Sequence, residues 1–221
     1  MEKKNVPFTE GNIPSTEATM TSTEEKILKA AEKEFLCKGF DGARTTSIAK
    51  AAGVTHAMLH YYFRSKENLF QRIISNKISL LGELMLSSLA DSSLPLFDKI
   101  SGAIERHLDF IASNPELPHF FIMEVYSHND RMEYMAETLK KNAVKSIASL
   151  QRDIDEAAAN GECRKMNAEM LLLDIISLNI FSFLTLPLLE NVLPELFSDK
   201  ERFIALRKKE NIDTIMRKLR P

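Results

Sequence analysis

Between residues 45 and 70 the apolar and polar positions follow the spacing of two short helices and the start of a longer one. The first short helix has Thr46 as its predicted N-cap residue and ends at Gly53, which can adopt a left-handed conformation. Thr55 offers a second N-cap, so another helix is predicted to begin near His56. Two short helices joined by a turn that contains glycine indicate a helix-turn-helix.

The second short helix leaves one face available for an interaction. Leu59 and Phe63 are four residues apart and face inward with Val54, so the remaining side chains lie mostly on the outer side. In a helix-turn-helix this second helix enters the major groove of DNA. The pattern therefore predicts a DNA-binding surface on the outer face.

A family resemblance supports this interpretation. The stretch IAKAAGV, then Thr55, then L-x-Y-Y-F-x-S-K-E-x-L-F from Leu59, resembles the N-terminal DNA-binding domain of the TetR/AcrR family of bacterial transcriptional regulators. The resemblance covers about residues 23–72, and beyond them only the general layout is similar. It also includes upstream positions, namely Ile27, Ala30, Ala31, Phe35, Gly39, Phe40 and Thr45. The resemblance implies an all-α homodimer that binds a palindromic double-stranded DNA operator, more often as a repressor.

The resemblance also implies which residues contact DNA. Phosphate contacts are expected from Thr45 and Thr46, from the aromatic row of the second helix and from Lys66, since a helix N-terminus with a hydroxyl group is an anion site. Base edges would be read from the same helix and from Ser47 beside it. The candidate DNA-binding residues are Thr45, Thr46, Ser47, Thr55, His56, Ala57, Met58, His60, Tyr61, Tyr62 and Lys66.

Two residues depart from the family pattern. Ala57 stands where the family often has glycine, and His60 stands where a tyrosine is usual. The His60 ring can still donate a hydrogen bond to a phosphate. His56 and Met58 offer no bidentate reader of guanine or adenine, so the operator sequence cannot be predicted.

Helical periodicity continues through the rest of the chain. The further predicted helices cover about 22–39, 66–88, 96–113, 116–125, 131–160, 168–186 and 199–219. Together with the helix-turn-helix they make an all-α fold of about nine helices. A three-helix DNA-binding domain over 21–72 is predicted to precede a larger helical domain over 73–221 that binds ligand and dimerises. Residues 1–20 are predicted to be a disordered polar arm.

The charge is divided unevenly between these parts. Residues 21–72 hold 9 Lys and Arg against 6 Asp and Glu, whereas residues 73–221 hold 18 against 22. This difference suggests a basic DNA-binding domain on an acidic body. Cys37 and Cys163 are far apart in sequence, so neither a disulfide framework nor a zinc site is predicted. A cytoplasmic location without a secretory signal is expected.

Other chemistries find little support in the sequence. His56 and His60 have the spacing of a metal pair, but HAMLH lacks the glutamate of H-E-x-x-H and a third ligand. The chain has no glycine-rich phosphate loop and no G-x-S-x-G, although His107 and His119 could contribute to a hidden site. No catalytic residues, metal or cofactor are therefore predicted. The alternative function is a helical enzyme or a protein-interaction adaptor that keeps a DNA-binding-like domain.

The stretch from Met170 to Leu189 is apolar enough to suggest a membrane span. Asp174 and Asn179 disfavour this, because a charged residue within a span is costly. A helix buried against its own core and against a second subunit is predicted instead, and no membrane partner is expected. In the family the last two helices pair with those of a second subunit. The candidate interface residues are Leu178, Phe183, Phe203, Ile212, Ile215, Met216 and Leu219.

Aromatic and methionine side chains gather between residues 100 and 135 and in the helix over 168–186. Ordinary core packing is the alternative for each of them. As a group with a few polar side chains, they can line a cavity between helices for an apolar or amphipathic small molecule. Such an effector would release DNA through the long helix that begins at Lys66. The candidate ligand-binding residues are Phe110, Phe120, Met123, Glu124, Tyr126, Met135, Asn179 and Phe181.

Overall fold

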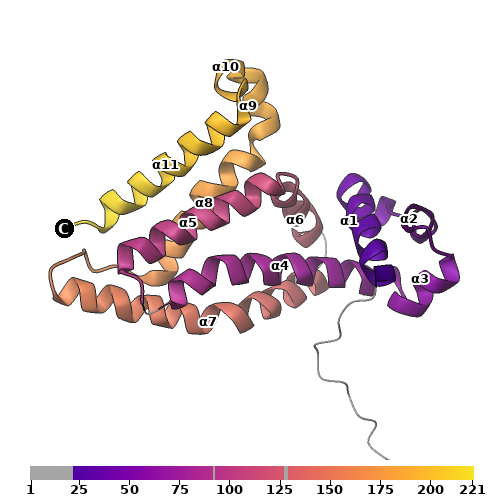
Figure 1. Ribbon diagram of the computed structural model, residues 1–221, viewed down its shortest axis with the longest axis horizontal. Helices are drawn as coiled ribbons and strands as arrows, with labels where there is room; N and C mark the ends of the chain where they lie inside the picture. Colours follow the sequence, from indigo (N-terminus) through magenta and orange to yellow (C-terminus); the bar gives the residue numbers. More distant parts are fainter. Residues whose placement is uncertain (1–21, 92, 127–128) are drawn as a thin grey trace, which may run out of the picture.

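The computed structural model describes residues 22–91, 93–126 and 129–221, and the polar arm predicted at 1–20 lies outside them. Eleven helices and no strand occur in the described part of the chain, which confirms the predicted all-α class (Figure 1). The helices are α1 (Ser22–Gly42), α2 (Thr45–Ala52), α3 (His56–Phe63), α4 (Lys66–Ala90), α5 (Leu96–Ser113), α6 (Leu117–Tyr126), α7 (Asn129–Ala159), α8 (Ala168–Leu184), α9 (Leu186–Val192), α10 (Pro194–Phe197) and α11 (Lys200–Leu219).

Two of these helices, α9 and α10, occupy a stretch in which the sequence predicts none. Pro187 lies in the first turn of α9, and Pro194 is the first residue of α10. Proline lacks an amide proton that the first turn of a helix does not use, so it can begin a helix as well as end one. In its described ranges the structure adds these two short helices to the nine that the sequence predicts, and the predicted bounds of α5 agree with the structure.

The boundaries near the helix-turn-helix differ from the prediction at two points. α1 is interrupted at Gly39, where φ is 67° and ψ is 177°, and then continues to Gly42. α2 begins at Thr45, with Arg44 as its N-cap residue and no side-chain cap. Thr46 therefore lies inside the first turn of α2, and the prediction that it is the N-cap is wrong.

α1, α2 and α3 pack at one end of the molecule around an apolar core (Figure 1). Ile27, Ile48 and Leu59 are completely buried there. The same cluster of buried side chains continues along α4 and includes Phe120 of α6. The boundary proposed between residues 72 and 73 thus falls within α4, and apolar packing crosses it.

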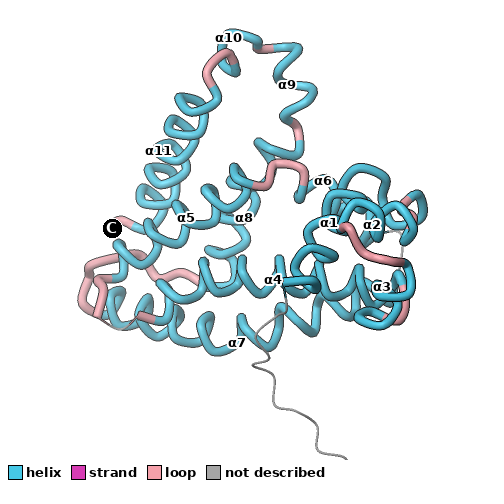
Figure 2. The backbone as a smooth tube through the Cα atoms, turned by 45° about the vertical axis from the view of Figure 1, so that its right-hand side comes forward, coloured by secondary structure: helices cyan, strands magenta, loops and turns pink. Residues whose placement is uncertain are grey.

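The larger part of the chain is a helical body in which α4 and α7 run side by side (Figures 1 and 2). α5 packs against α4, α8 and α11, and α11 also contacts α8. Completely buried side chains fill the space between these helices, including Leu89, Ile100, Ile104, Leu150, Ile154 and Leu171. α4 contributes to both apolar cores, so it joins the helix-turn-helix to the body mechanically as well as covalently.

α8 buries only part of its surface within the chain. Its inward face packs in the body, whereas Met170, Leu173 and Phe181 are exposed on the other side. No single helix in the described ranges is long and apolar enough to cross a membrane. α8 and α9 satisfy that test only together, and the chain bends by 60° between them.

A buried polar network links α5, α8 and α11. The Asn179 side-chain amide donates to the carbonyl oxygen of Ile104 at 3.0 Å and to His107 Nδ1 at 3.1 Å. Asn211 donates to Asn179 Oδ1 at 2.8 Å. Because an amide nitrogen only donates, His107 Nδ1 is the acceptor and carries no proton. Burial lowers the pKa of His107 to about 4, since the apolar surroundings disfavour the charged ring.

This buried imidazole predicts a loss of stability in mild acid. Between its ordinary pKa of 6.5 and the folded value of about 4, the unfolded chain binds more protons at His107 than the folded chain. The free energy of unfolding should therefore be highest above pH 6.5 and fall by up to about 3 kcal/mol as the pH drops to about 4. Urea titrations across this range measure it. His107→Gln, which keeps an acceptor for Asn179 but cannot titrate, should flatten the dependence, and an unchanged slope would contradict the assignment.

Candidate nucleic-acid interface

The helix-turn-helix forms where the sequence predicts it. Gly53 ends α2 in a left-handed conformation, with φ 69° and ψ 30°. The hydroxyl oxygen of Thr55 accepts a hydrogen bond from the Met58 amide at 3.2 Å and caps α3. Leu59 and Phe63 turn inward and are buried. These contacts orient α3 so that its opposite face points to solvent.

The predicted DNA-contacting side chains lie on that face or beside it. Tyr61 is 82% exposed, and its ring meets the neighbouring Tyr62 ring edge to face, with the centroids 5.5 Å apart. Exposed candidates are Thr46, Thr55, His56, Ala57, Met58, His60 and Tyr61, and half-buried candidates are Thr45, Ser47, Tyr62 and Lys66. The structure brings this set together on α2, α3 and the start of α4, and its contact with DNA stays a prediction.

Both histidines of α3 are engaged within the protein. His56 Nε2 lies 3.0 Å from the hydroxyl of Thr45, and the His56 and His60 rings meet edge to face with centroids 4.6 Å apart. His60 Nδ1 donates to the carbonyl oxygen of Arg64 at 2.8 Å, so a phosphate contact through Nε2 requires the protonated ring. No group of three His, Cys, Asp or Glu side chains suited to a metal ion occurs among the described residues.

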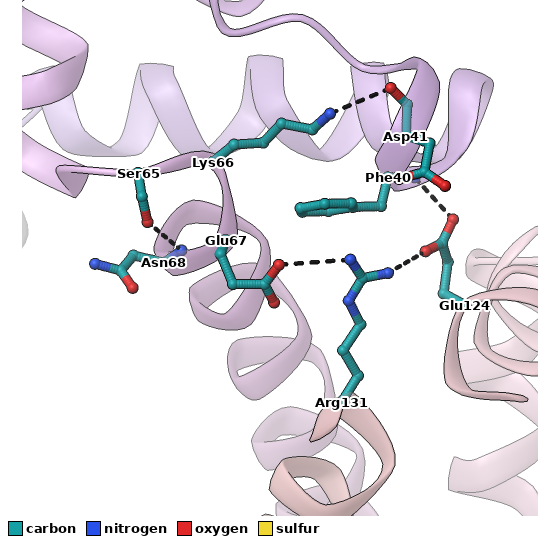
Figure 3. Close-up of polar contacts among 8 residues, drawn as sticks. All are labelled: Phe40, Asp41, Ser65, Lys66, Glu67, Asn68, Glu124 and Arg131. Atoms are coloured by element: carbon teal, nitrogen blue, oxygen red, sulfur yellow. Dashed lines mark hydrogen bonds and ion pairs between the residues drawn. The ribbon is translucent and has the colours of Figure 1, made fainter. Parts of the chain in front are cut away.

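Lys66, the predicted phosphate ligand at the start of α4, folds back onto α1. Its ammonium group donates to the carbonyl oxygen of Asp41 at 3.3 Å and lies 4.5 Å from the centroid of the Phe40 ring (Figure 3). The group is half-buried at the edge of the α3 surface. Contact with a phosphate would therefore replace a long hydrogen bond to a neutral carbonyl by a charge-assisted one.

Two exposed arginines beside this surface escape the sequence prediction. Arg44 is the N-cap residue of α2, and Arg64 is the C-cap residue of α3. Arg64 has φ 59° and is the one non-glycine residue with positive φ in the described ranges. Residue spacing carries no information on φ. The sequence signal that could have identified Arg64 as a candidate DNA-contacting residue was its basic side chain between α3 and Lys66.

Arg64→Gly is expected to stabilise the protein and to weaken its binding to DNA. Glycine removes the Cβ that strains a left-handed backbone, so the free energy of unfolding should rise by about 1 kcal/mol. The guanidinium group is lost at the same time. Arg64→Ala is the matched control, because it shares the loss of charge but keeps the strain. Urea unfolding and DNA titration measure both effects, and equal stability changes in the two variants would contradict the strain.

Residues 27–73, which build this surface, match the family model of bacterial regulatory proteins, tetR family. These residues form a tetR-family domain. The match begins in α1 and ends in the first part of α4, so it contains the whole helix-turn-helix. The resemblance seen in the sequence is confirmed.

The curated proteins similar to this chain include HTH-type transcriptional regulators by name. The uncharacterized HTH-type transcriptional regulator YdgC of Bacillus subtilis is 33% identical over 95 residues, which are 42% of this chain and 49% of that protein. The HTH-type transcriptional repressor SCO4008 of Streptomyces coelicolor is 32% identical over 99 residues, 45% of this chain and 47% of that protein. The chain spans about half the length of these curated relatives.

Solved structures extend the likeness to the whole fold. The putative transcriptional regulator SCO4942 from Streptomyces coelicolor has a TM-score of 0.67 and 22% identity, covering 90% of this chain and 100% of that one. The transcriptional regulator FadR from Bacillus subtilis, in complex with stearoyl-CoA, has a TM-score of 0.65 and 19% identity, covering 88% and 98%. The helical body of this chain therefore shares its fold with these two structures.

A charged junction holds the tetR-family domain to the body (Figure 3). Arg131 of α7 is 7% exposed, and its guanidinium group contacts Glu124 of α6 at 2.8 Å and Glu67 of α4 at 3.4 Å. The same group lies over the Phe40 ring of α1, 3.8 Å from its centroid, and 4.8 Å from the centroid of Phe70. One side chain of the body thus contacts two helices of the DNA-binding domain.

Glu124 adds a direct hydrogen bond between the body and α1. Its Oε1 atom accepts from the Phe40 amide at 2.7 Å, next to the interruption at Gly39. A Cβ atom on Gly39 would stand 2.9 Å from that oxygen, so glycine permits the approach. α6 and α7 therefore provide a route to the DNA-binding domain in addition to α4, which sequence reasoning had predicted as the transmitter.

The predicted ligand-binding residues fall in different places. Phe120, Met123 and Glu124 line one cleft beside α1. Phe110 is buried in an apolar cluster, Asn179 belongs to the polar network, Met135 packs near the helix-turn-helix core and Phe181 is exposed. The side chain of Tyr126 is not among the parts of the chain that the structure describes. The structure thus groups three of the candidates and separates the others.

The predicted dimer residues lie mostly in the core of the single chain. Buried side chains among them are Phe183, Phe203, Ile215, Met216 and Leu219, while Leu178 and Ile212 are partly buried against the body core. Side chains this deep are not available to a second subunit. The exposed apolar side chains of α8, namely Met170, Leu173, Ile176 and Phe181, form the α8 outer face, a surface that a second subunit can reach.

Proposed function

We propose that this chain is a transcriptional regulator that binds a palindromic DNA operator as a homodimer and acts as a repressor. The observation that carries the proposal is the exposed α3 face, with Tyr61 and His56 held outward by a capped and buried helix-turn-helix. An aromatic and imidazole surface flanked by Arg44, Arg64 and Lys66 suits a groove edge lined with phosphates. A bacterial operator lies in the cytoplasm, so this function also places the protein there.

Dimerisation through the α8 outer face fits this function. One recognition helix reads few base pairs, and twofold symmetry supplies a second helix about one DNA turn, ~34 Å, away. Met170, Leu173 and Ile176 are exposed at three-residue intervals along α8, and Phe181 follows five residues later, so exposed apolar side chains recur over more than two turns of the helix. Scattered exposed apolar side chains are common, but a row along one helix favours an interface.

Regulation by an apolar or amphipathic small molecule also fits. The structural neighbour FadR from Bacillus subtilis holds stearoyl-CoA, an amphipathic molecule. In this chain the junction of Arg131 with Glu67 and Glu124 joins the body to the DNA-binding domain. A ligand that favours one arrangement of this junction changes DNA affinity by its differential binding energy.

A binding titration with DNA from upstream of its own gene, at several salt concentrations, tests the DNA contact. Lys66→Ala should weaken binding to all sequences and reduce the salt slope by about 1, because a phosphate contact releases counterions without reading bases. Lys209→Ala on α11, an exposed lysine outside the tetR-family domain, is the control and should behave as wild type. Equal DNA affinity and equal salt slope in the two variants would contradict the proposed contact between Lys66 and a phosphate.

A further inference from the structure

A cleft of about 400 Å³ opens where the DNA-binding domain meets the body. Its walls come from the end of α1 at Gly39, from α6 with the residues just before it, and from the end of α8 with the start of α9. Figure 1 shows α6 beside α1 at this corner of the molecule. A molecule in this cleft would touch three parts of the chain that are far apart in sequence.

The lining of the cleft is apolar with acidic groups. Phe120, Met123 and Leu184 are among its apolar side chains, and Glu116 and Glu124 contribute carboxylates. Among the described residues no lysine or arginine lines it, and His119 adds an imidazole. Carboxylates beside apolar walls attract a positive charge that is attached to an apolar body, and they repel an anion of the same shape.

We infer that this cleft binds an amphipathic organic cation, such as an amine or quaternary ammonium group with an apolar tail or ring. The inference rests on the proposed function, because it names the chemical class and the site of the effector. The cation lies near Glu124, and the apolar part lies along Met123 and Leu184.

The position of Glu124 couples such a ligand to the DNA-binding domain. Its Oε1 atom accepts from the Phe40 amide at 2.7 Å, and its Oε2 atom accepts from Arg131 at 2.8 Å. A cation that draws this carboxylate towards the cleft competes with both donors. Loss of the Phe40 bond loosens the end of α1 from α6, and by linkage DNA binding then opposes ligand binding.

Calorimetric titration of the DNA-free protein tests the inference with two probes of equal chain length, decyltrimethylammonium and decanoate, both below micelle formation. The cation should bind and the anion should not. Met123→Lys places a positive charge at an exposed position of the cleft and should weaken cation binding about tenfold or more. Leu80→Lys, an equally drastic change at an exposed apolar position of α4 outside the cleft, is the control and should bind as wild type.

Selective binding of the cation, lost in Met123→Lys and kept in Leu80→Lys, supports the inference. Equal binding of both probes, no binding of the cation, or wild-type binding by Met123→Lys would overturn it. The titration contains no DNA, whereas the DNA titration contains no ligand. Failure of this site is therefore distinguishable from failure of the proposed DNA-binding function.

Discussion

Leu173→Arg is expected to separate the proposed dimer into monomers and to lower operator affinity about 100-fold or more. Leu173 lies within the α8 outer face and is 54% exposed in the single chain, so arginine is tolerated by the folded monomer. In a dimer the same side chain would become buried, where an unpaired charge costs several kcal/mol. A monomer can bind only one half-site of the operator. It therefore loses the additional affinity that two linked DNA-binding domains provide.

Light scattering after size-exclusion chromatography measures the mass, and DNA titration measures the affinity. Leu80→Arg is the matched control, because Leu80 is 46% exposed on α4 and lies outside the α8 outer face. A dimer that persists in Leu173→Arg would exclude this interface. The buried Ile215 is no substitute for this test, since a charge there would unfold the chain itself.

Arg131→Met is expected to lower the free energy of unfolding by about 3 kcal/mol, because breaking a buried ion pair leaves its partners uncompensated. Methionine can still pack on Phe40 and Phe70, so the substitution mainly removes the positive charge of the guanidinium group. Glu124, whose side chain is 14% exposed, would keep its bond to the Phe40 amide but lose the guanidinium group. The DNA-binding domain and the body should then unfold less cooperatively.

Urea unfolding followed by circular dichroism measures this effect. Adding Glu124→Gln to Arg131→Met removes the unpaired carboxylate and should recover part of the lost stability, since a neutral amide is less costly to bury than a charge. A single variant as stable as wild type, or a double variant less stable than the single one, would contradict the role given to the junction.

The helix-turn-helix could be predicted because its signals are local. Gly53 and Thr55 determine the turn and the second cap within a few residues, and Leu59 and Phe63 reveal the buried face of α3. The misplaced cap at Thr46 shows the limit of such signals. A threonine can serve as a cap or lie in the first turn, and only the backbone before it, at Arg44 here, decides.

The charged junction and the proposed dimer surface could not be predicted in the same way. Glu67, Glu124 and Arg131 belong to α4, α6 and α7, and nothing in their spacing shows that they meet. In α8 and α11, apolar periodicity predicted a stripe of apolar side chains, but it did not show whether that stripe packs within the chain or against a second subunit. Ile215 packs in its own chain, whereas Leu173 on α8 stays exposed, and this division depends on how α5 lies against α8 and α11.

Selection of bound sequences from a random pool of double-stranded DNA tests the central claim most directly. A twofold regulator should enrich an imperfect palindrome whose half-sites lie about one helical turn, ~34 Å, apart. Substituting His56 or Tyr61 should change the enriched sequence, because these side chains lie where base edges would be read. A pool that stays random after repeated selection at physiological salt would contradict sequence-specific DNA binding by this chain.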